Sequence, residues 1–155
     1  MRRIESEECR LWRLFLTAHS VTVPGVEREL RTLTDISLVD LEALVELGAN
    51  GGRMRMAELA ESMGVSRSGI TRCVDRLGRR GLVKRAAVPD DKRGSYAVIT
   101  PSGRTHLEEV LPAYEVAVNR RFASILTPAE RTMLSDVLER LRAAGDADSA
   151  SRTGA

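Results

Sequence analysis

The stretch at residues 54–72 restricts the possible fold more than any other part of the chain. Its first half places apolar residues at helical spacing, and Gly64 then suits the left-handed backbone conformation that ends a helix. Ser66 can cap a second helix, whose predicted buried face is formed by Ile70, Cys73, Val74 and Leu77. Two helices joined by a tight glycine turn are typical of a helix-turn-helix, whose second helix enters the major groove of DNA.

Lysine and arginine are concentrated in the same region. Residues 66–104 contain ten Lys and Arg against three Asp and Glu, whereas both flanking segments contain more acidic than basic residues. The net charge of +2 for the whole chain therefore hides one basic block between two acidic ones. A basic block of this kind is expected of a protein that binds a polyanion such as nucleic acid.

The polar face of the second helix has the residue types that contact DNA. Opposite the predicted buried face, near the N-terminal end of the helix, lie Arg67, Ser68, Thr71 and Arg72. Arginine can donate two hydrogen bonds to guanine, while serine and threonine can reach phosphate or base edges. An ordinary solvated helix face has a similar composition. The turn, the cap and the basic block together favour DNA contact, so we predict that these four residues read the groove.

A β-hairpin is predicted directly after this helix. Residues 82–88 and 95–100 have the pattern of strands, and the charged turn between them contains Asp91, Lys92 and Arg93. An arginine at the tip of such a wing can insert into the minor groove, so we predict that Arg93 contacts DNA. Asp91 would repel phosphate, so we predict that it holds an arginine in a charge-assisted pair. We predict that Asp91 and Lys92 both support the wing. A simple solvated loop is the alternative.

Helices with apolar stripes are predicted on both sides of this head. The first stripe continues from residue 11 to residue 33, and Pro24-Gly25 is expected to kink or restart that helix. On the other side, Thr100 and Thr127 each precede a proline, which is typical of a capped helix start. Such helices need a partner surface. A second copy of the chain is the simplest partner, so we favour a homodimer over packing within one chain.

The predicted fold is mainly α with a small β wing, a winged helix-turn-helix head with terminal helices that form a dimerisation region. Residues 1–36 form the N-terminal dimerisation helix region and residues 37–100 form the DNA-binding head. Residues 101–143 form the C-terminal dimerisation helices, and the composition of residues 144–155 predicts a disordered tail.

Composition and missing motifs argue against several other classes of function. Aromatic residues make up 3% of the chain, too few for a surface that stacks single-stranded bases. His19 and His106 are the only histidines and no glycine-rich phosphate loop follows a strand, so we predict no enzyme activity, metal or cofactor. Neither a secretory signal nor a membrane-spanning run is predicted, and we expect a cytoplasmic protein with no membrane partner. A winged helix that serves protein–protein assembly is the alternative, and it would lack salt-sensitive affinity for duplex DNA.

The order and residues of these elements resemble the MarR family of transcriptional regulators. The resemblance rests on five strings of residues: Leu59-Ala60 through Gly64-Val65-Ser66-Arg67-Ser68, then Thr71-Arg72-Cys73-Val74-Asp75-Arg76-Leu77, then Arg80-Gly81-Leu82-Val83, then the wing motif Asp91-Lys92-Arg93-Gly94, and finally Ile99-Thr100-Pro101-Ser102-Gly103. It implies a sequence-specific homodimer that binds a pseudo-palindromic operator in double-stranded DNA, usually as a repressor. By position, it implies that Ser66, Arg67, Ser68, Thr71 and Arg72 read the groove and that Arg93 is the wing arginine. One departure is Arg55, which stands at a helix cap where Thr or Ser is usual.

The resemblance also implies that a small molecule or an oxidant releases the DNA. Similar regulators bind their effectors between the dimer helices and the head, and the candidate lining residues of such a site here are Trp12, Phe15, His19, Leu44 and Arg80. Plain packing or solvent exposure is the simpler explanation for Trp12 and His19. The alternative trigger is oxidation of Cys9, because one branch of the family has a reactive cysteine near the start of its first helix. That branch surrounds the thiol with tyrosines, whereas this chain has Arg13 one turn on, so we favour a small organic ligand.

Overall fold

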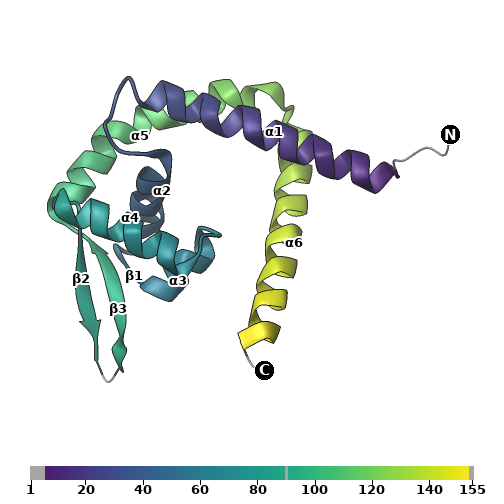
Figure 1. The fold of residues 1–155 in the computed structure, drawn as a ribbon. Helices are drawn as coiled ribbons and strands as arrows, with labels where there is room; N and C mark the ends of the chain where they lie inside the picture. The colour runs from purple at the N-terminus through teal and green to yellow at the C-terminus, as the bar shows by residue number, and fades with distance from the viewer. Residues whose placement is uncertain (1–5, 90, 154–155) are drawn as a thin grey trace.

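Long helices extend from a small head in the computed structural model of the chain (Figure 1). The structure describes residues 6–89 and 91–153, without the side chains of Lys92, Arg93 and residues 146–153. Helix α1 (Glu7–Leu30) lies beside α5 (Pro101–Arg121), and α6 (Pro128–Thr153) turns away from both after a short 3-10 turn. Among the helices described, none has both the length and the apolar character needed to cross a bilayer.

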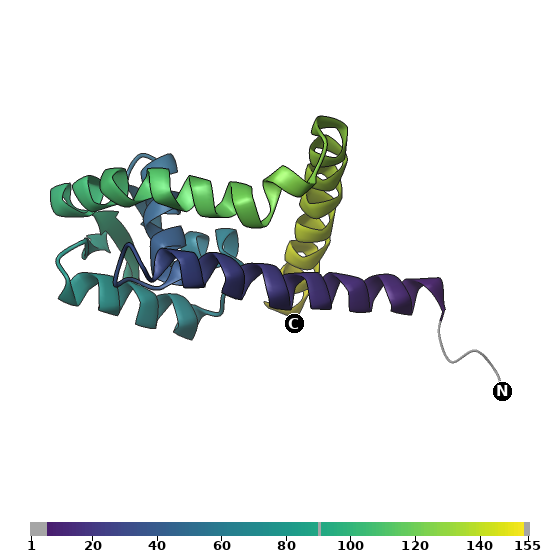
Figure 2. The same cartoon turned by 90° about the horizontal axis from the view of Figure 1, so that it is seen from above.

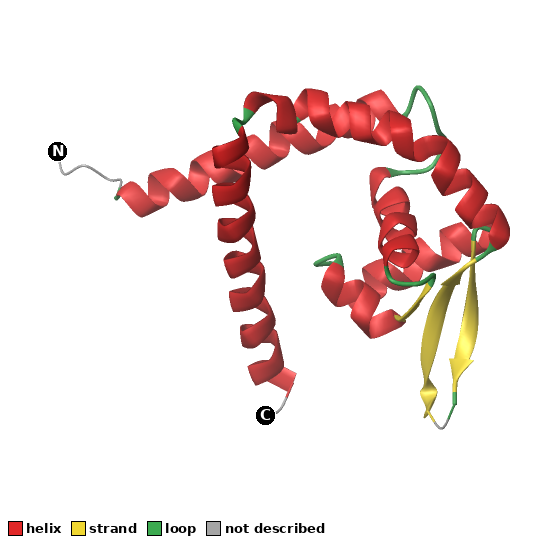
Figure 3. Cartoon of the chain, turned by 180° about the vertical axis from the view of Figure 1, so that it is seen from behind, coloured by secondary structure: helices red, strands yellow, loops and turns green. Residues whose placement is uncertain are grey.

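The head combines three helices with a small antiparallel sheet. Its helices are α2 (Leu38–Ala49), α3 (Met56–Ser62) and α4 (Arg67–Arg79). The strands β1 (Arg53–Arg55), β2 (Val83–Val88) and β3 (Asp91–Ile99) lie in the order β1-β3-β2. Seen from behind, β2 and β3 project from the head as a long hairpin (Figure 3). This is the predicted winged helix-turn-helix.

The core of the head is formed by the predicted apolar faces. Every residue predicted on the inner face of the second helix is buried, and the largest fully buried side chains of the head include Leu41, Leu44, Leu47, Leu59, Ile70, Val74 and Leu77. Burial of a Leu or Ile side chain stabilises a fold by about 1.5–3 kcal/mol. The apolar contact between α2, α3 and α4 therefore supports the orientation of α4.

The predicted capping residues define the helix starts. Ser37 Oγ accepts from the N–H of Asp40 at 3.2 Å, and Thr100 Oγ1 accepts from the N–H of Gly103 at 3.0 Å. At the start of α6, Thr127 forms the predicted capping box, because Glu130 Oε2 accepts from the N–H of Thr127 at 2.8 Å. Each such cap stabilises a helix by about 1 kcal/mol.

The first helix does not restart at Pro24. Helix α1 is one helix with Pro24 inside it, and Figure 2 shows it unbroken. Proline removes one hydrogen bond of the helix, but α5 packs against the turn that follows. Gly25 is buried there, a Cβ on it would lie 3.4 Å from the side chain of Arg121, and Arg121 Nε donates to Glu29 Oε1 at 2.5 Å. This packing stabilises the helix across the proline, since tertiary contacts outweigh local propensity.

The last helix also extends beyond its predicted end. The backbone of α6 is helical to Thr153, whereas the composition predicts disorder from residue 144. Alanine has the highest helix propensity, and Ala143 and Ala144 continue the helix without an intervening proline. A low apolar content therefore did not mark a helix end here.

The apolar stripes of α1 and α6 lie on the surface of the single chain. Twelve large apolar side chains of α1, α6 and the turn before α6 are at least 40% exposed: Leu11, Trp12, Leu14, Phe15, Leu16, Val21, Phe122, Ile125, Met133, Val137, Leu138 and Leu141. Monomeric proteins seldom expose contiguous apolar surface on this scale. Among the described residues, these two helices and the turn before α6 therefore carry most of the large apolar side chains that one chain leaves exposed.

Candidate nucleic-acid interface

The five predicted groove-reading residues lie together at the N-terminal end of α4. Ser66 caps the helix, since its Oγ accepts from the N–H of Gly69 at 3.1 Å, and the hydroxyls of Ser66 and Ser68 are 3.2 Å apart. Arg67, Ser68, Thr71 and Arg72 are exposed, whereas Ile70 between them is buried. Within the part of the chain that the structure describes, the guanidinium groups of Arg67 and Arg72 make no ion pair. Their donors are therefore available to an external acceptor.

An ion pair between the half-exposed Arg76 and the buried Asp40 fixes α4 against α2. Arg76 donates from Nε to Asp40 Oδ2 at 2.9 Å and from Nη2 to Asp40 Oδ1 at 2.6 Å. This is the bidentate geometry that a guanidinium and a carboxylate prefer. Burial alone would raise the pKa of Asp40, but hydrogen bonds with Arg76, Cys73 and Ser37 outweigh it and lower the pKa. The sequence analysis missed this pair because Asp40 and Arg76 are 36 residues apart.

A second ion pair connects the wing to α3. Arg55 Nη1 lies 3.3 Å from Asp91 Oδ2, and the N–H of Gly94 donates to Asp91 Oδ1 at 3.0 Å. Asp91 thus holds an arginine, as its position in the turn predicted, and the partner is Arg55. The start of α3 is served instead by Glu58, whose Oε2 accepts from the N–H of Arg55 at 2.9 Å. The side chain of Arg55 is therefore free of a capping role and joins two elements of the head.

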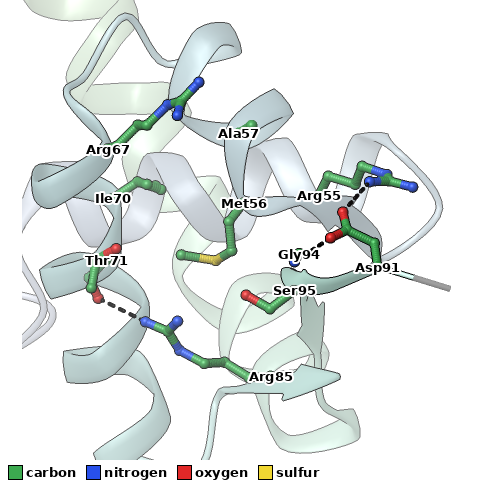
Figure 4. Close-up of a pocket in the computed structure, with 10 residues that line it drawn as sticks. All are labelled: Arg55, Met56, Ala57, Arg67, Ile70, Thr71, Arg85, Asp91, Gly94 and Ser95. Carbon is green, nitrogen blue, oxygen red and sulfur yellow. Dashed lines mark hydrogen bonds and ion pairs between the residues drawn. The ribbon is translucent and has the colours of Figure 1, made fainter. Parts of the chain in front are cut away.

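A cleft of about 350 Å³ lies between α4 and the wing (Figure 4). Three arginines from three elements line it: Arg55 before α3, Arg67 on α4 and Arg85 on β2. Arg85 Nη2 donates to Asp75 Oδ1 at 2.8 Å and lies 3.5 Å from the carbonyl oxygen of Thr71. The sequence analysis did not single out Arg85. Only the strand register reveals its direction, since Arg85 pairs with the fully buried Ala97 and so lies on the head-facing side of the sheet.

The predictions for the wing tip extend beyond the described side chains. Lys92 was predicted to support the wing and Arg93 to enter the minor groove, but neither side chain is described by the structure. Their backbone belongs to β3, in the hairpin that projects from the head. Both assignments therefore stay predictions.

The candidate effector residues do not come together in one chain. Trp12, Phe15 and His19 are exposed on α1, and the rings of Trp12 and Phe15 stack with their centroids 5.7 Å apart. Leu44 is completely buried in the head, and Arg80 is paired with Asp35. That set is therefore not a pocket of the single chain. The apolar character of Leu44 reflects packing of α2 against the rest of the head.

The two cysteines lie in different environments. Cys9 is exposed in the first turn of α1. Cys73 is buried as predicted, and burial together with the nearby Asp40 carboxylate raises the pKa of its thiol to about 12. A thiol in that state is not a nucleophile, because the thiolate is the reactive form. Any thiol chemistry of this chain would therefore use Cys9.

The head matches a known family. Residues 34–94 match the family model described as MarR family. Two proteins of Bacillus subtilis (strain 168) are similar in sequence. The uncharacterized HTH-type transcriptional regulator YfiV is 31% identical over 101 residues, 65% of this chain, and the HTH-type transcriptional repressor MdtR is 32% identical over 97 residues, 63% of this chain. The match covers 62% of the length of each of these two relatives.

Solved structures extend the similarity to nearly the whole chain. AbsC, a MarR family transcriptional regulator from Streptomyces coelicolor, superposes with a TM-score of 0.79 at 30% identity, covering 91% of this chain and 95% of AbsC. Sco3205, another MarR family transcriptional regulator from Streptomyces coelicolor, whose structure is a complex with DNA, superposes with a TM-score of 0.80. It is 29% identical, and the match covers 91% of this chain and 89% of Sco3205. The shared part therefore includes the terminal helices as well as the head.

Proposed function

The chain belongs to the MarR family of DNA-binding transcriptional regulators, and from that membership we propose that it binds a pseudo-palindromic operator as a homodimer and acts as a repressor. The observation that carries this proposal is the exposed face at the start of α4, where Arg67, Thr71 and Arg72 stand beside a wing with no competing ion pair on either arginine in the described part of the chain. This is the end of a recognition helix that enters the major groove. MdtR is a repressor and Sco3205 was solved with DNA, which supports both halves of the proposal.

The uncovered helices support the homodimer. The exposed apolar side chains on α1 and α6 belong to the two elements that extend farthest from the head (Figure 1). A second copy that contributes the same helices would bury both stripes in a two-fold interface. Two heads held by such an interface would present two recognition helices to one face of the duplex, which is why the operator should be an inverted repeat.

The protein should select an inverted repeat from a pool of random duplexes, with affinity that falls steeply as salt is raised. If the recognition helices lie one helical turn apart, the half-site centres should be about 10 base pairs apart. Each phosphate contact should contribute about −0.9 to the slope of log affinity against log salt. Sequencing of the selected duplexes and a salt titration provide the measurement. Recovery of no common sequence, together with affinity indifferent to salt, would favour the protein-assembly alternative.

The proposed trigger for release is a small organic acid that binds between α1 and α5. A cleft of about 470 Å³ lies there, a volume typical of small-molecule sites. Its apolar lining includes Leu33, Val116 and Ala117, and Arg28 and Arg120 provide positive charge. Glu29 lines the cleft as well, and its carboxylate is already paired with Arg120 and Arg121. The apolar side chains could contact an aromatic ring, and an arginine side chain could bind a carboxylate group on that ring. Such a ligand would release DNA only to the extent that it binds the DNA-incompetent arrangement more tightly than the competent one.

Arg28→Ala should weaken the releasing effect of an aromatic carboxylate while leaving operator affinity unchanged. A charge-assisted hydrogen bond contributes about 1.5–3 kcal/mol, so release should need at least about tenfold more ligand. The measurement is operator binding during titration with benzoate and its ring-substituted forms. Cys9→Ser is the comparison variant. If it binds the operator normally but no longer releases it under mild peroxide, while benzoates have no effect on the wild type, Cys9 oxidation is the trigger and the ligand proposal is wrong.

A further inference from the structure

The cleft between α4 and the wing lies where a DNA strand must pass. When α4 occupies the major groove and the wing reaches the adjacent minor groove, the phosphodiester strand that separates the two grooves crosses between these elements. We propose that Arg55 and Arg85 bind the phosphates of that strand and that Asp91 and Asp75 hold the two arginines in position. This inference rests on the proposed function and assigns its backbone contacts to residues outside the predicted groove-reading set.

The geometry of Arg85 fits a phosphate contact. Its side chain is 41% exposed and reaches the cleft from the head-facing side of β2, opposite Arg67 and Thr71 on α4 (Figure 4). The contacts with Asp75 and the carbonyl oxygen of Thr71 both use Nη2. A guanidinium has five N–H donors in a planar fork, so donors on Nε and Nη1 are left for a phosphate oxygen.

The geometry of Arg55 repeats the arrangement on the wing side. Its side chain is 43% exposed and lines the same cleft, and its Nη1 contacts Asp91 Oδ2. The hydroxyls of Thr71 and Ser95 belong to the lining as well, and they add neutral donors to the two guanidinium groups. The cleft thus combines cations from two sides with hydroxyl donors, which suits a phosphodiester rather than a base edge.

The two carboxylates explain why the arginines are ready to bind. Ion pairs this exposed contribute little to folding, so their main effect lies elsewhere. A long arginine side chain loses conformational freedom when it is fixed on a phosphate, and a carboxylate that already holds it reduces that loss. Asp75 and Asp91 are therefore positioning residues, although each of them alone repels DNA.

The sign of the Asp75→Ala effect tests this inference. Removal of a negative charge near DNA should strengthen binding if only net charge matters. Positioning predicts the reverse, a loss of affinity of about twofold to tenfold on any duplex sequence. In an Arg85→Ala background there is no arginine left for Asp75 to hold, so there the same substitution should strengthen binding. Tighter or equal binding by the single variant Asp75→Ala would overturn the proposal.

Arg85→Ala tests the phosphate contact itself. It should reduce the slope of log affinity against log salt by about 0.9 and weaken binding about tenfold at 0.1 M salt, equally for operator and random duplex. The matched control is the ion pair of Glu27 and Arg31 at the C-terminal end of α1, because neither residue lines the cleft. Arg31→Ala and Glu27→Ala remove the same charges there and should leave the slope unchanged. Titration at stoichiometric DNA gives the active fraction of each variant, because misfolded protein lowers that fraction and not the slope. An unchanged slope in active Arg85→Ala would overturn the assignment, whereas wild-type protein without salt-dependent duplex binding would refute the proposed function instead.

Discussion

Val137→Glu combined with Leu141→Glu should convert the protein to a monomer and weaken operator binding by about 10²–10⁴-fold, which is the gain that linkage of two half-site contacts provides. Both residues lie on the exposed apolar stripe of α6, four residues apart and thus on one side of the helix. Burial of a carboxylate in an apolar interface without a partner is strongly unfavourable, so the two chains should separate. Sedimentation and a gel shift on the selected operator provide the measurement.

The control for this prediction lies on the same helix. Ser135 is two residues from Val137 and therefore points to the opposite side of α6. Ser135→Glu adds a carboxylate without touching the stripe, and it should leave both the dimer and the affinity intact. A Val137→Glu, Leu141→Glu protein that stays dimeric and binds as the wild type does would show that α6 is not the interface.

Arg67→Ala and Arg72→Ala should each reduce specific affinity by about 1–3 kcal/mol, or roughly tenfold to 150-fold, where the arginine reads a base. A residue that contacts only phosphate should weaken all sequences alike. Arg93→Ala should weaken binding most on operators with A·T-rich flanks, since the narrow minor groove there attracts arginine most strongly. Competition between the operator and random duplex separates these outcomes.

Arg79→Ala is the matched control, because Arg79 is exposed on the same helix but lies at its C-terminal end. It should change neither the discrimination between sequences nor the oligomeric state. Unchanged operator binding by Arg67→Ala, Arg72→Ala and Arg93→Ala together would refute the assignment of this face.

Local signals predicted the head well. The caps at Ser37, Ser66, Thr100 and Thr127 depend on residues within three positions of each other, so each was readable from a few neighbouring letters. The buried face of α4 followed from helical spacing alone. The same spacing placed Arg67, Ser68, Thr71 and Arg72 on one exposed side, since a helix that buries one face must present the other.

Contacts between distant residues could not be predicted in the same way. Asp40 with Arg76 and Arg55 with Asp91 are each 36 residues apart, and their partnership depends on how three helices and a hairpin pack. Asp91 shows the limit clearly, because its need for an arginine was predictable while the identity of Arg55 was not. Arg85 required the register of β2 against β3, which no local pattern specifies.

The differences at Pro24, at the end of α6 and in the effector set have separate causes. At Pro24, packing against α5 outweighs the local tendency of proline to break a helix. At the end of α6, a low apolar content suggested disorder, whereas the helix propensity of alanine favours the helix. The effector residues were predicted from their residue types and from their expected place between the dimer helices and the head. Leu44 then proved to be part of the core of the head, and the cleft between α1 and α5 is lined by other residues.

The measurement that tests the central claim most directly is a hydroxyl-radical footprint of the full chain on its selected duplex, with the protein–DNA stoichiometry measured on the same sample. The account predicts two protected patches related by two-fold symmetry, with centres about 10 base pairs or about 34 Å apart, and two chains bound per duplex. A single protected half-site with one chain per duplex, or protection that does not weaken as salt is raised, would contradict it.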